Sequence, residues 1–511
     1  MKELDRASGV LLHISSLPGG DGIGTIGREA FQWIDFLNSA GVKYWQILPL
    51  NPTGYGNSPY QGLSAFAGNP LFIDLQDLIH DGLLNNTDLQ QPPRFPLQKV
   101  DFQKVIAWKP AVLKCAYDHF FSGELSQINH EYEQFDNANA SWLRDFALFM
   151  ALREKYQLVS WNKWPDALRM RKPKALQAFE KENRQEIEIH KFLQFLFFRQ
   201  WGKLKSYANS KGIQLIGDIP IFMGYDCADV WAYPHLFQLD KNREPLAVAG
   251  VPPDFFSETG QLWGNPLYDW ETHEKENYKW WITRVNETLK TVDLIRLDHF
   301  RGFAGYYRIP AGAKTAEVGE WVSGPGKNLF DAMLARIGRL PFIAEDLGVI
   351  TEDVIALRER YNFPGMRLLQ FAFWEDADHE FLPHNYPDNC VVYTGTHDND
   401  TTVGWYKSAP QYERNFCASY LGGHTTDIAY EMIRTIWRTN ALIAIAPMQD
   451  FLRLDGWARM NLPATTAGNW LWRMKPGAVT SRLAKWIKKI NITFNRASGE
   501  KIWKAGDYFK E

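Results

Sequence analysis

Short apolar runs recur along the chain, and segments with helical patterning separate several of them. Apolar residues repeat at helical spacing within 30–37, 278–285 and 330–337. Buried strands that alternate with helices predict an α/β fold with a parallel sheet, and eight such units predict a closed (β/α)8 TIM barrel. The eight runs that we expect to be strands are 9–14, 44–50, 213–219, 292–298, 342–346, 366–371, 390–395 and 441–446.

Two intervals are too long to be simple connections between a strand and the next helix. The interval 76–210, between the second and third expected strands, carries helical stripes and predicts a largely helical insertion. The interval 223–273, between the third and fourth, is rich in Pro, Gly and aromatic residues and predicts a loop-rich insertion, with an ordered loop at 251–266. Both leave from strand C-terminal ends, so we expect them to overhang that face of the barrel.

The remainder of the chain adds no further domain to this picture. A last amphipathic helix is expected at 482–489, and no separate C-terminal β domain is indicated. We therefore expect residues 1–511 to form a single barrel unit with large insertions at its C-terminal face.

Composition excludes several classes of function. A formal net charge of −3 gives no reason to expect nucleic acid or another polyanion as a partner. The N-terminus MKELDRASGV has no apolar segment behind its charges, and no run approaches the roughly 18 apolar residues of a membrane span. We expect a cytoplasmic protein without a membrane partner. The four cysteines have no metal-ligand spacing, which indicates free thiols and no metal site.

Three motifs place a carboxylate where an expected strand ends. They are IRLDHFRG at 295–302, FIAEDLG at 342–348 and YTGTHDND at 393–400, with the acids Asp298, Glu345 and Asp398. Parallel strands of one barrel would gather these acids at a single rim, the C-terminal rim where barrel enzymes do their chemistry. This arrangement predicts an enzyme that acts on glycosidic bonds. The aromatic content of 14% fits, because flat rings stack on sugars, although most of these rings should fill the core.

Two of the acids have properties that suit a pair of catalytic carboxylates. Arg296 and Asp298 share a strand face, so the guanidinium favours the ionised carboxylate that a nucleophile requires. Glu345 would face inward and act as a proton donor, with its pKa raised by the charge of Asp298 and by partial burial. The alternatives are a structural Arg–Asp pair and a salt bridge at the rim. Asp346 points the other way and is expected to be structural.

Asp398 follows His397 in a polar cluster that suits the binding of sugar hydroxyls. In that interpretation His397 donates to hydroxyls and Asp398 holds the ring as it flattens toward an oxocarbenium ion. A metal site, a helix cap and a stabilised turn are the alternatives. Asp218, at the end of the third strand, would bind hydroxyls, orient Arg296 or be purely structural. The loop 51–61 offers Ser58 and Tyr60, and Tyr60 is a candidate platform under a sugar.

Longer motifs carry a resemblance to a known family. The chain resembles glycoside hydrolase family 77, the amylomaltases or disproportionating enzymes, from about residue 6 to about residue 473. The motifs are RASGVLLHISSLPGGDGIG, YWQILPLNPTGYGNSPYQGLSAFAGNP, GDIPIF, GVPPDFFSETGQLWGNPLYDW, IRLDHFRGF, AEDLG, TGTHDNDT and RMNLPATTAGNW. The resemblance implies a retaining transglycosylase that moves α-1,4-glucan segments between malto-oligosaccharides, without a cofactor.

The resemblance also implies roles for individual residues. Asp298 corresponds to the nucleophile, Glu345 to the general acid/base and Asp398 to the stabiliser of the transition state. Positions that bind sugar in the family match Tyr60, Asp218, Arg296 and His397, whereas Asp254 and Trp263 fall in a loop over the acceptor side.

One departure from the family pattern concerns its second covering loop. The family usually has Pro-Gly there, and this chain has Pro463-Ala464. If the position is left-handed, Ala464 would strain or reshape the loop.

The three acids do not determine whether the sugar is transferred to another sugar or to water. We expect the aromatic residues Phe255, Phe256 and Trp263 of the overhanging loop to exclude water. The alternatives to a transferase are an α-amylase-like hydrolase and a catalytically silent glucan-binding protein.

Overall fold

The computed structural model describes residues 4–89, 92–123, 126–253 and 257–497. At its centre eight strands pair in parallel in the order β10-β11-β12-β1-β2-β3-β6-β9. Between the two ends of this order, the Ala344 N–H donates to the Pro364 carbonyl at 2.9 Å. The expected TIM barrel is thus confirmed, and each predicted run overlaps one strand. The strands are β1 (Ala7–Leu11), β2 (Tyr44–Gln46), β3 (Gln214–Pro220), β6 (Leu294–Asp298), β9 (Phe342–Ala344), β10 (Gly365–Leu368), β11 (Cys390–Tyr393) and β12 (Ile443–Pro447).

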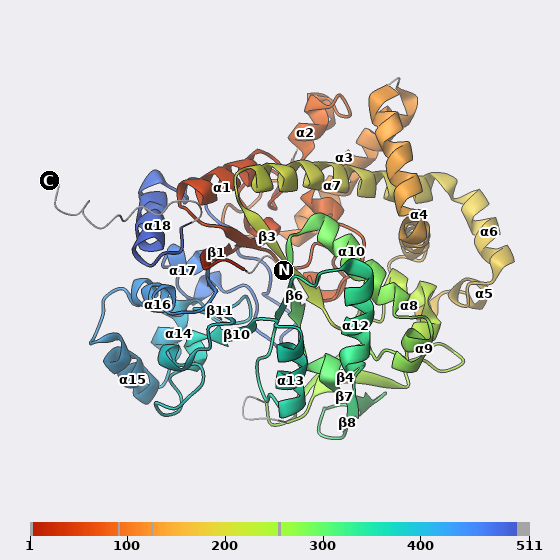
Figure 1. Cartoon of the computed structure of the whole chain (residues 1–511). Coiled ribbons are helices and arrows are strands. Elements are labelled where there is room, and N and C mark those ends of the chain that lie inside the picture. The colour runs from red at the N-terminus through yellow and green to blue at the C-terminus, as the bar shows by residue number, and fades with distance from the viewer. Residues whose placement is uncertain (1–3, 90–91, 124–125, 254–256, 498–511) are drawn as a thin grey trace.

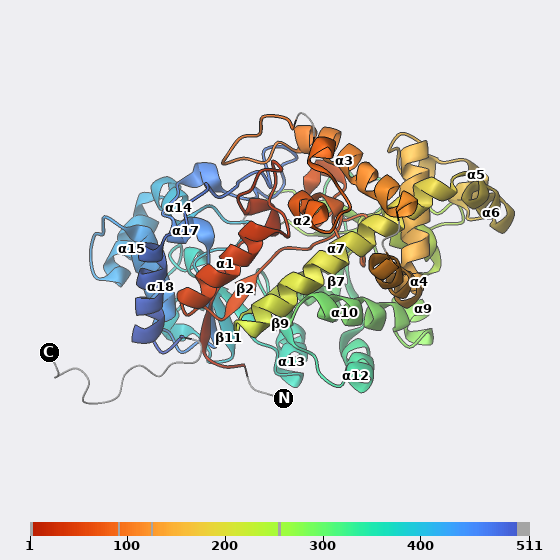
Figure 2. The same ribbon diagram turned by 90° about the horizontal axis from the view of Figure 1, so that it is seen from above.

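The barrel strands are apolar because side chains fill the interior and helices cover the outside. Every residue of β1, β11 and β12 is buried. Around them lie α1 (Arg28–Ser39), α7 (Arg184–Ser210), α10 (Lys279–Thr291), α12 (Gly326–Ile337), α13 (Glu352–Arg360), α14 (Thr402–Ser408), α15 (Gln411–Leu421), α16 (Ile428–Trp437), α17 (Met448–Phe451) and α18 (Ser481–Thr493), as Figures 1 and 2 show.

The helical stripes expected from the sequence face the core. In α1 the residues Ala30, Trp33, Ile34 and Leu37 are all buried. In α12 the stripe is narrower than expected, because Leu334 is 42% exposed.

The chain between β2 and β3 is largely helical. Its helices extend to the right of the barrel in Figures 1 and 2, and α7 returns from them along the barrel to β3. The long helix α4 packs along α7, with aromatic rings such as Phe135 and Phe195 between them. The helices before α7 are α2 (Leu75–His80), α3 (Phe102–Ser122), α4 (Ser126–Lys155), α5 (Asp166–Arg169) and α6 (Pro173–Glu182).

A second sheet of four antiparallel strands, in the order β5-β4-β7-β8, lies beside the barrel. It consists of β4 (Ala247–Val251), β5 (Gln261–Pro266), β7 (Gly305–Pro310) and β8 (Glu320–Ser323), and α8 (Ala228–Ala232) and α9 (Trp270–Lys275) flank its first two strands in the sequence. The interpretation of 251–266 as loop was wrong for β5, and no strand was predicted at β7 or β8. Most residues of β5 and β8 are exposed or half-buried, so they lack the apolar run that identified the barrel strands.

The four cysteines are free thiols, as expected. Within the described ranges, we find no helix that combines the length and the apolar character needed to cross a membrane.

Candidate active site

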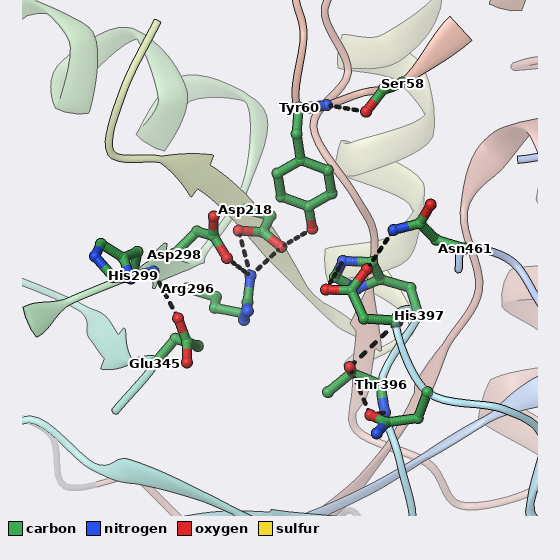
Figure 3. Close-up of polar contacts among 12 residues, drawn as sticks. Ser58, Tyr60, Asp218, Arg296, Asp298, His299, Glu345, Thr396, His397 and Asn461 are labelled. Atoms are coloured by element: carbon green, nitrogen blue, oxygen red, sulfur yellow. Dashed lines mark hydrogen bonds and ion pairs between the residues drawn. The ribbon is translucent and has the colours of Figure 1, made fainter. Parts of the chain in front are cut away.

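The polar side chains singled out in the sequence meet at the C-terminal end of the barrel (Figure 3). They come from strands or loops that are far apart in the chain. Asp218 belongs to β3, Arg296 and Asp298 belong to β6, Glu345 directly follows β9, and His397 lies in the loop after β11. The barrel therefore converts strand ends separated by up to about 180 residues into one cluster, as the strand-end pattern predicts.

Arg296 is the central cation of this cluster. Its Nη1 atom lies 2.8 Å from Asp218 Oδ2 and 2.9 Å from Asp298 Oδ1. The Tyr60 hydroxyl donates to Asp218 Oδ2 at 2.7 Å. The Asp218 side chain is fully buried and that of Arg296 is 4% exposed. Of the alternatives for Asp218, the geometry favours the orientation of Arg296, which in turn fixes Asp298.

The Glu345 carboxylate is fixed by two backbone N–H groups. The His299 N–H donates to Oε2 at 2.6 Å, and the Leu347 N–H donates to Oε1 at 3.0 Å. His299 has a φ of +53°, a left-handed conformation that costs energy in a non-glycine residue. Such strain is typical of functional sites, and here it accompanies the aiming of a backbone donor at the carboxylate. Trp263 packs edge-on against the His299 ring, with ring centres 4.8 Å apart.

Asp398 is held by one partner on each carboxylate oxygen. His397 Nε2 lies 3.3 Å from Oδ2, and the Asn461 side-chain amide donates to Oδ1 at 2.6 Å. The Asn461 N–H also donates to the His397 carbonyl at 3.0 Å, and Arg459 donates to the Asp398 carbonyl at 2.6 Å. The loop that starts at Asn461 is therefore attached directly to Asp398.

Three aromatic rings pack together in the site. Tyr60 and His397 lie nearly parallel, with centres 5.0 Å apart and an interplanar angle of 14°. The Trp470 ring is tilted relative to both, with its centre 6.0 Å from that of Tyr60 and 5.9 Å from that of His397. Tyr60 is thus a packing partner of His397 as well as a candidate sugar platform, and Ser58 shapes its loop by accepting the Tyr60 N–H at 3.2 Å.

Burial raises the pKa of both candidate catalytic acids. For Asp298 burial is the largest cause; Arg296 opposes it and Asp218 adds to it, which leaves the pKa at about 6. For Glu345 burial again dominates, Arg296 opposes it and the charge of Asp298 adds to it, which leaves the pKa at about 7. Near neutral pH one carboxyl is therefore mainly ionised while the other retains a proton for much of the time, as a nucleophile and an acid require.

Asp398 remains a carboxylate at any working pH. Burial alone would raise its pKa, but the charge and hydrogen bond of His397 and the hydrogen bond of Asn461 outweigh burial and hold the pKa at about 2. The pKa of His397 is raised, because the attraction of Asp398 exceeds the effect of burial. The pair therefore offers a fixed negative charge beside a donor, which suits sugar hydroxyls and a developing positive charge.

The remaining predicted residues fall into different places. Asp346 points away from the site, accepts the Met366 N–H at 2.6 Å and pairs with Arg358, so it is structural as expected. Ala464 has a φ of +61°, so it adopts the left-handed conformation in which an alanine is expected to strain or reshape the loop. Asp254, Phe255 and Phe256 lie outside the described residues.

Sequence reasoning about single residues missed Arg459, Asn461 and Trp470. They lie about 60 to 70 residues beyond Asp398, and the only signal was their presence in the RMNLPATTAGNW motif. Among the described residues, no group of three or more His, Cys, Asp or Glu side chains is arranged to hold a metal ion.

Comparison with known proteins gives consistent matches over nearly the whole chain. The model of glycoside hydrolase family 77, described as 4-alpha-glucanotransferase, matches residues 12–480. A 4-alpha-glucanotransferase of Thermus thermophilus is 48% identical over 486 residues, covering 94% of this chain and 96% of its own. A chloroplastic/amyloplastic 4-alpha-glucanotransferase of Solanum tuberosum is 45% identical over 501 residues, covering 96% and 86%. The structure of amylomaltase from Streptococcus agalactiae in complex with acarbose superposes with a TM-score of 0.93 at 39% identity, covering 96% of this chain and 100% of that one.

Proposed function

Because this chain belongs to the 4-alpha-glucanotransferases of glycoside hydrolase family 77, its activity is glucan transfer, and we propose that transfer proceeds with retention through a covalent bond to Asp298. The donors and acceptors in this proposal are α-1,4-glucans and malto-oligosaccharides. The observation that carries it is the pair of half-buried acids around Arg296, with pKa values of about 6 for Asp298 and about 7 for Glu345.

In the first step an oxygen of Asp298 attacks the anomeric carbon of the donor, and the bond from that carbon to the glycosidic oxygen breaks. Glu345 gives its proton to the departing oxygen, so the leaving glucan carries a new 4-hydroxyl. Arg296, 2.9 Å from Asp298, holds the attacking carboxylate in place and in its charged form. Asp398 stabilises the positive charge that develops on the sugar ring, because its carboxylate stays ionised near neutral pH.

In the second step the 4-hydroxyl of an acceptor sugar attacks the same carbon. Glu345, now ionised, takes the hydroxyl proton, and the bond to Asp298 breaks. Two inversions give net retention. For such a mechanism we expect the two carboxyl groups to be about 5 to 5.5 Å apart in the substrate complex, not the roughly 6.5 to 9.5 Å of inverting enzymes.

We propose that the loops around the site, and not the acids, determine whether a sugar or water accepts the glucan. Trp263 packs against the ring of His299, and the backbone N–H of His299 binds Glu345, so a single residue links this tryptophan to the acid that activates the acceptor. A sugar that stacks there would displace water from the acid, which favours transfer over hydrolysis.

Maltotriose distinguishes a transferase from the alternatives. A ladder of longer maltodextrins with release of glucose is expected, whereas shorter sugars alone would identify a hydrolase. Asp298→Asn should abolish turnover and keep oligosaccharide binding; an unchanged rate would remove Asp298 from the mechanism. No turnover by the wild type would leave a silent glucan-binding protein.

The covalent intermediate can be tested with an activated donor. The fluoride ion of α-maltotriosyl fluoride departs without a proton from an acid, so the Glu345→Ala variant should be glycosylated quickly. The glycosylated variant should then turn over slowly, because no base activates the acceptor. Intact-mass spectrometry should show one maltotriosyl adduct, and peptide mapping after proteolysis should place it on the peptide that contains Asp298. The matched control is the double variant with Asp298→Asn, which should show none. Absence of the adduct from Glu345→Ala, or its presence on another peptide, would contradict the proposal.

A further inference from the structure

Trp321, on the outer strand β8, is a large apolar side chain left on the surface. It is 46% exposed, whereas tryptophans of the core such as Trp33 and Trp281 are almost completely buried. No step of the proposed mechanism uses it.

The Trp321 ring is held in place by two neighbouring side chains. The Arg301 guanidinium lies over it, 3.9 Å from the ring centre, and the Tyr307 ring packs at 5.4 Å with an interplanar angle of 60°. Arg301 itself is anchored, because its Nη1 atom donates to the Val349 carbonyl. An aromatic ring that is fixed before a ligand arrives loses little conformational entropy on binding.

The ring is connected to the loops that carry the catalytic acids. Arg301 begins helix α11 (Arg301–Ala304) and follows Asp298 by three residues, a stretch of chain that spans at most about 10 Å. Val349 follows Glu345 by four residues and is 71% exposed. We call Trp321, Arg301 and Val349 the outer platform. Because Arg301 and Val349 lie in the segments that leave the C-terminal ends of β6 and β9, the outer platform lies at the same end of the barrel as the acids.

We propose that the outer platform binds a distant part of a long α-1,4-glucan by stacking of a glucose unit on Trp321. This proposal rests on the proposed function and names the length class of its substrate. One face of a glucose ring consists of C–H groups, which match the open side of the indole, while the ring hydroxyls can remain in water. A chain longer than maltotriose would reach both the acids and the platform, and the second contact would act at high effective concentration.

A glucan fits this surface better than a second copy of the chain does. A stable protein interface buries about 800 Å² on each partner, whereas one tryptophan contributes at most about 250 Å². The outer platform has one exposed aromatic ring and one exposed valine, so its area suits a single sugar unit.

The test compares long and short donors in matched variants. In Trp321→Ala the ratio of kcat/KM for maltoheptaose to kcat/KM for maltotriose should fall about fivefold, the size expected from the loss of one ring contact. Trp321→Phe, which keeps a ring, should keep most of the ratio. The control Tyr412→Ala removes a 59% exposed ring from α15 and should leave the ratio unchanged.

Binding without turnover gives a second readout. In an Asp298→Asn background, calorimetry should show weaker maltoheptaose binding when Trp321 is also replaced by Ala, with the affinity for maltotriose unchanged. Equal loss for both sugars, an unchanged ratio, or a change in sedimentation coefficient that identifies a second copy as the occupant would overturn the proposal. Failure of the wild type to disproportionate maltotriose would instead contradict the proposed function, and the binding arm would still report on the platform.

Discussion

Replacement of Asp298 by Asn should stabilise the protein at alkaline pH and have a smaller effect at acid pH. The folded protein raises the pKa of Asp298 from an ordinary 3.8 to about 6. A carboxyl whose pKa is raised by folding stabilises the fold fully below its unfolded pKa, and this contribution is lost as pH rises through the folded value. The wild type therefore loses stability between about pH 4 and pH 6, whereas the amide of the Asp298→Asn variant does not titrate.

The magnitude follows from the two pKa values. One pKa unit is worth about 1.4 kcal/mol, so the loss is at most about 3 kcal/mol above pH 7 and about 1 kcal/mol at pH 4.5. The Asp298 side chain is 28% exposed, and solvent screening makes these upper bounds. The amide oxygen of the variant can still accept the hydrogen bond from Arg296. For 511 residues the entropy of unfolding is about 1.1 kcal/mol per kelvin, so 3 kcal/mol corresponds to about 3 °C in Tm.

Scanning calorimetry of both proteins at pH 4.5 and pH 8 measures the effect. We expect the variant to gain up to about 3 °C at pH 8 and about 1 °C at pH 4.5. The control Asp378→Asn removes an exposed carboxylate and should match the wild type at both pH values. Equal gains at the two pH values would mean that the attraction of Arg296 balances burial, and a less stable variant at pH 8 would mean that it outweighs burial; either result would refute the reasoning.

Three further measurements test other parts of the site. The pH profile of kcat/KM should be bell-shaped, falling below about pH 6 as Asp298 gains a proton and above about pH 7 as Glu345 loses one; a flat profile from pH 5 to 9 would contradict the pairing. Asn461→Ala removes a charge-assisted hydrogen bond to Asp398 and should lower kcat about tenfold or more, while KM stays within about twofold of the wild-type value. An unchanged kcat would show that the contact is dispensable. Ala464→Gly relieves a left-handed alanine and should raise the free energy of unfolding by up to about 1 kcal/mol, measured by urea denaturation against Ala467→Gly, which should give no gain.

The barrel could be predicted because its eight strands are buried on both faces and therefore read as continuous apolar runs. The same logic located Asp298 and Glu345, since acids at the ends of parallel strands must share a rim. The four-stranded sheet could not be predicted in this way. β8 has the burial of a surface strand, and its pairing with β7 depends on tertiary contacts that no local pattern encodes.

The residues that hold the acids in place could not be predicted from the sequence either. Asn461 reaches Asp398 across 63 residues of chain, so neither spacing nor period connects them. Strand parity predicted the pairing of Arg296 with Asp298, but it could not give the balance between that attraction and burial, which requires the solvent exposure of each group. The position of Asp298 was predictable, whereas the direction of its pKa shift was not.

The imbalance of charge around Arg296 also determines which small molecules should inhibit the enzyme. Asp218, Asp298, Glu345 and Asp398 face the Arg296 guanidinium and the His397 imidazole, and Arg459 binds the backbone carbonyl of Asp398, so carboxyl groups still outnumber cations. A sugar analogue with a protonated nitrogen at the ring or at the glycosidic position would supply the missing positive charge. Such bases should bind most tightly where Glu345 is ionised and the analogue is still protonated, so their potency should rise through pH 7 while turnover declines.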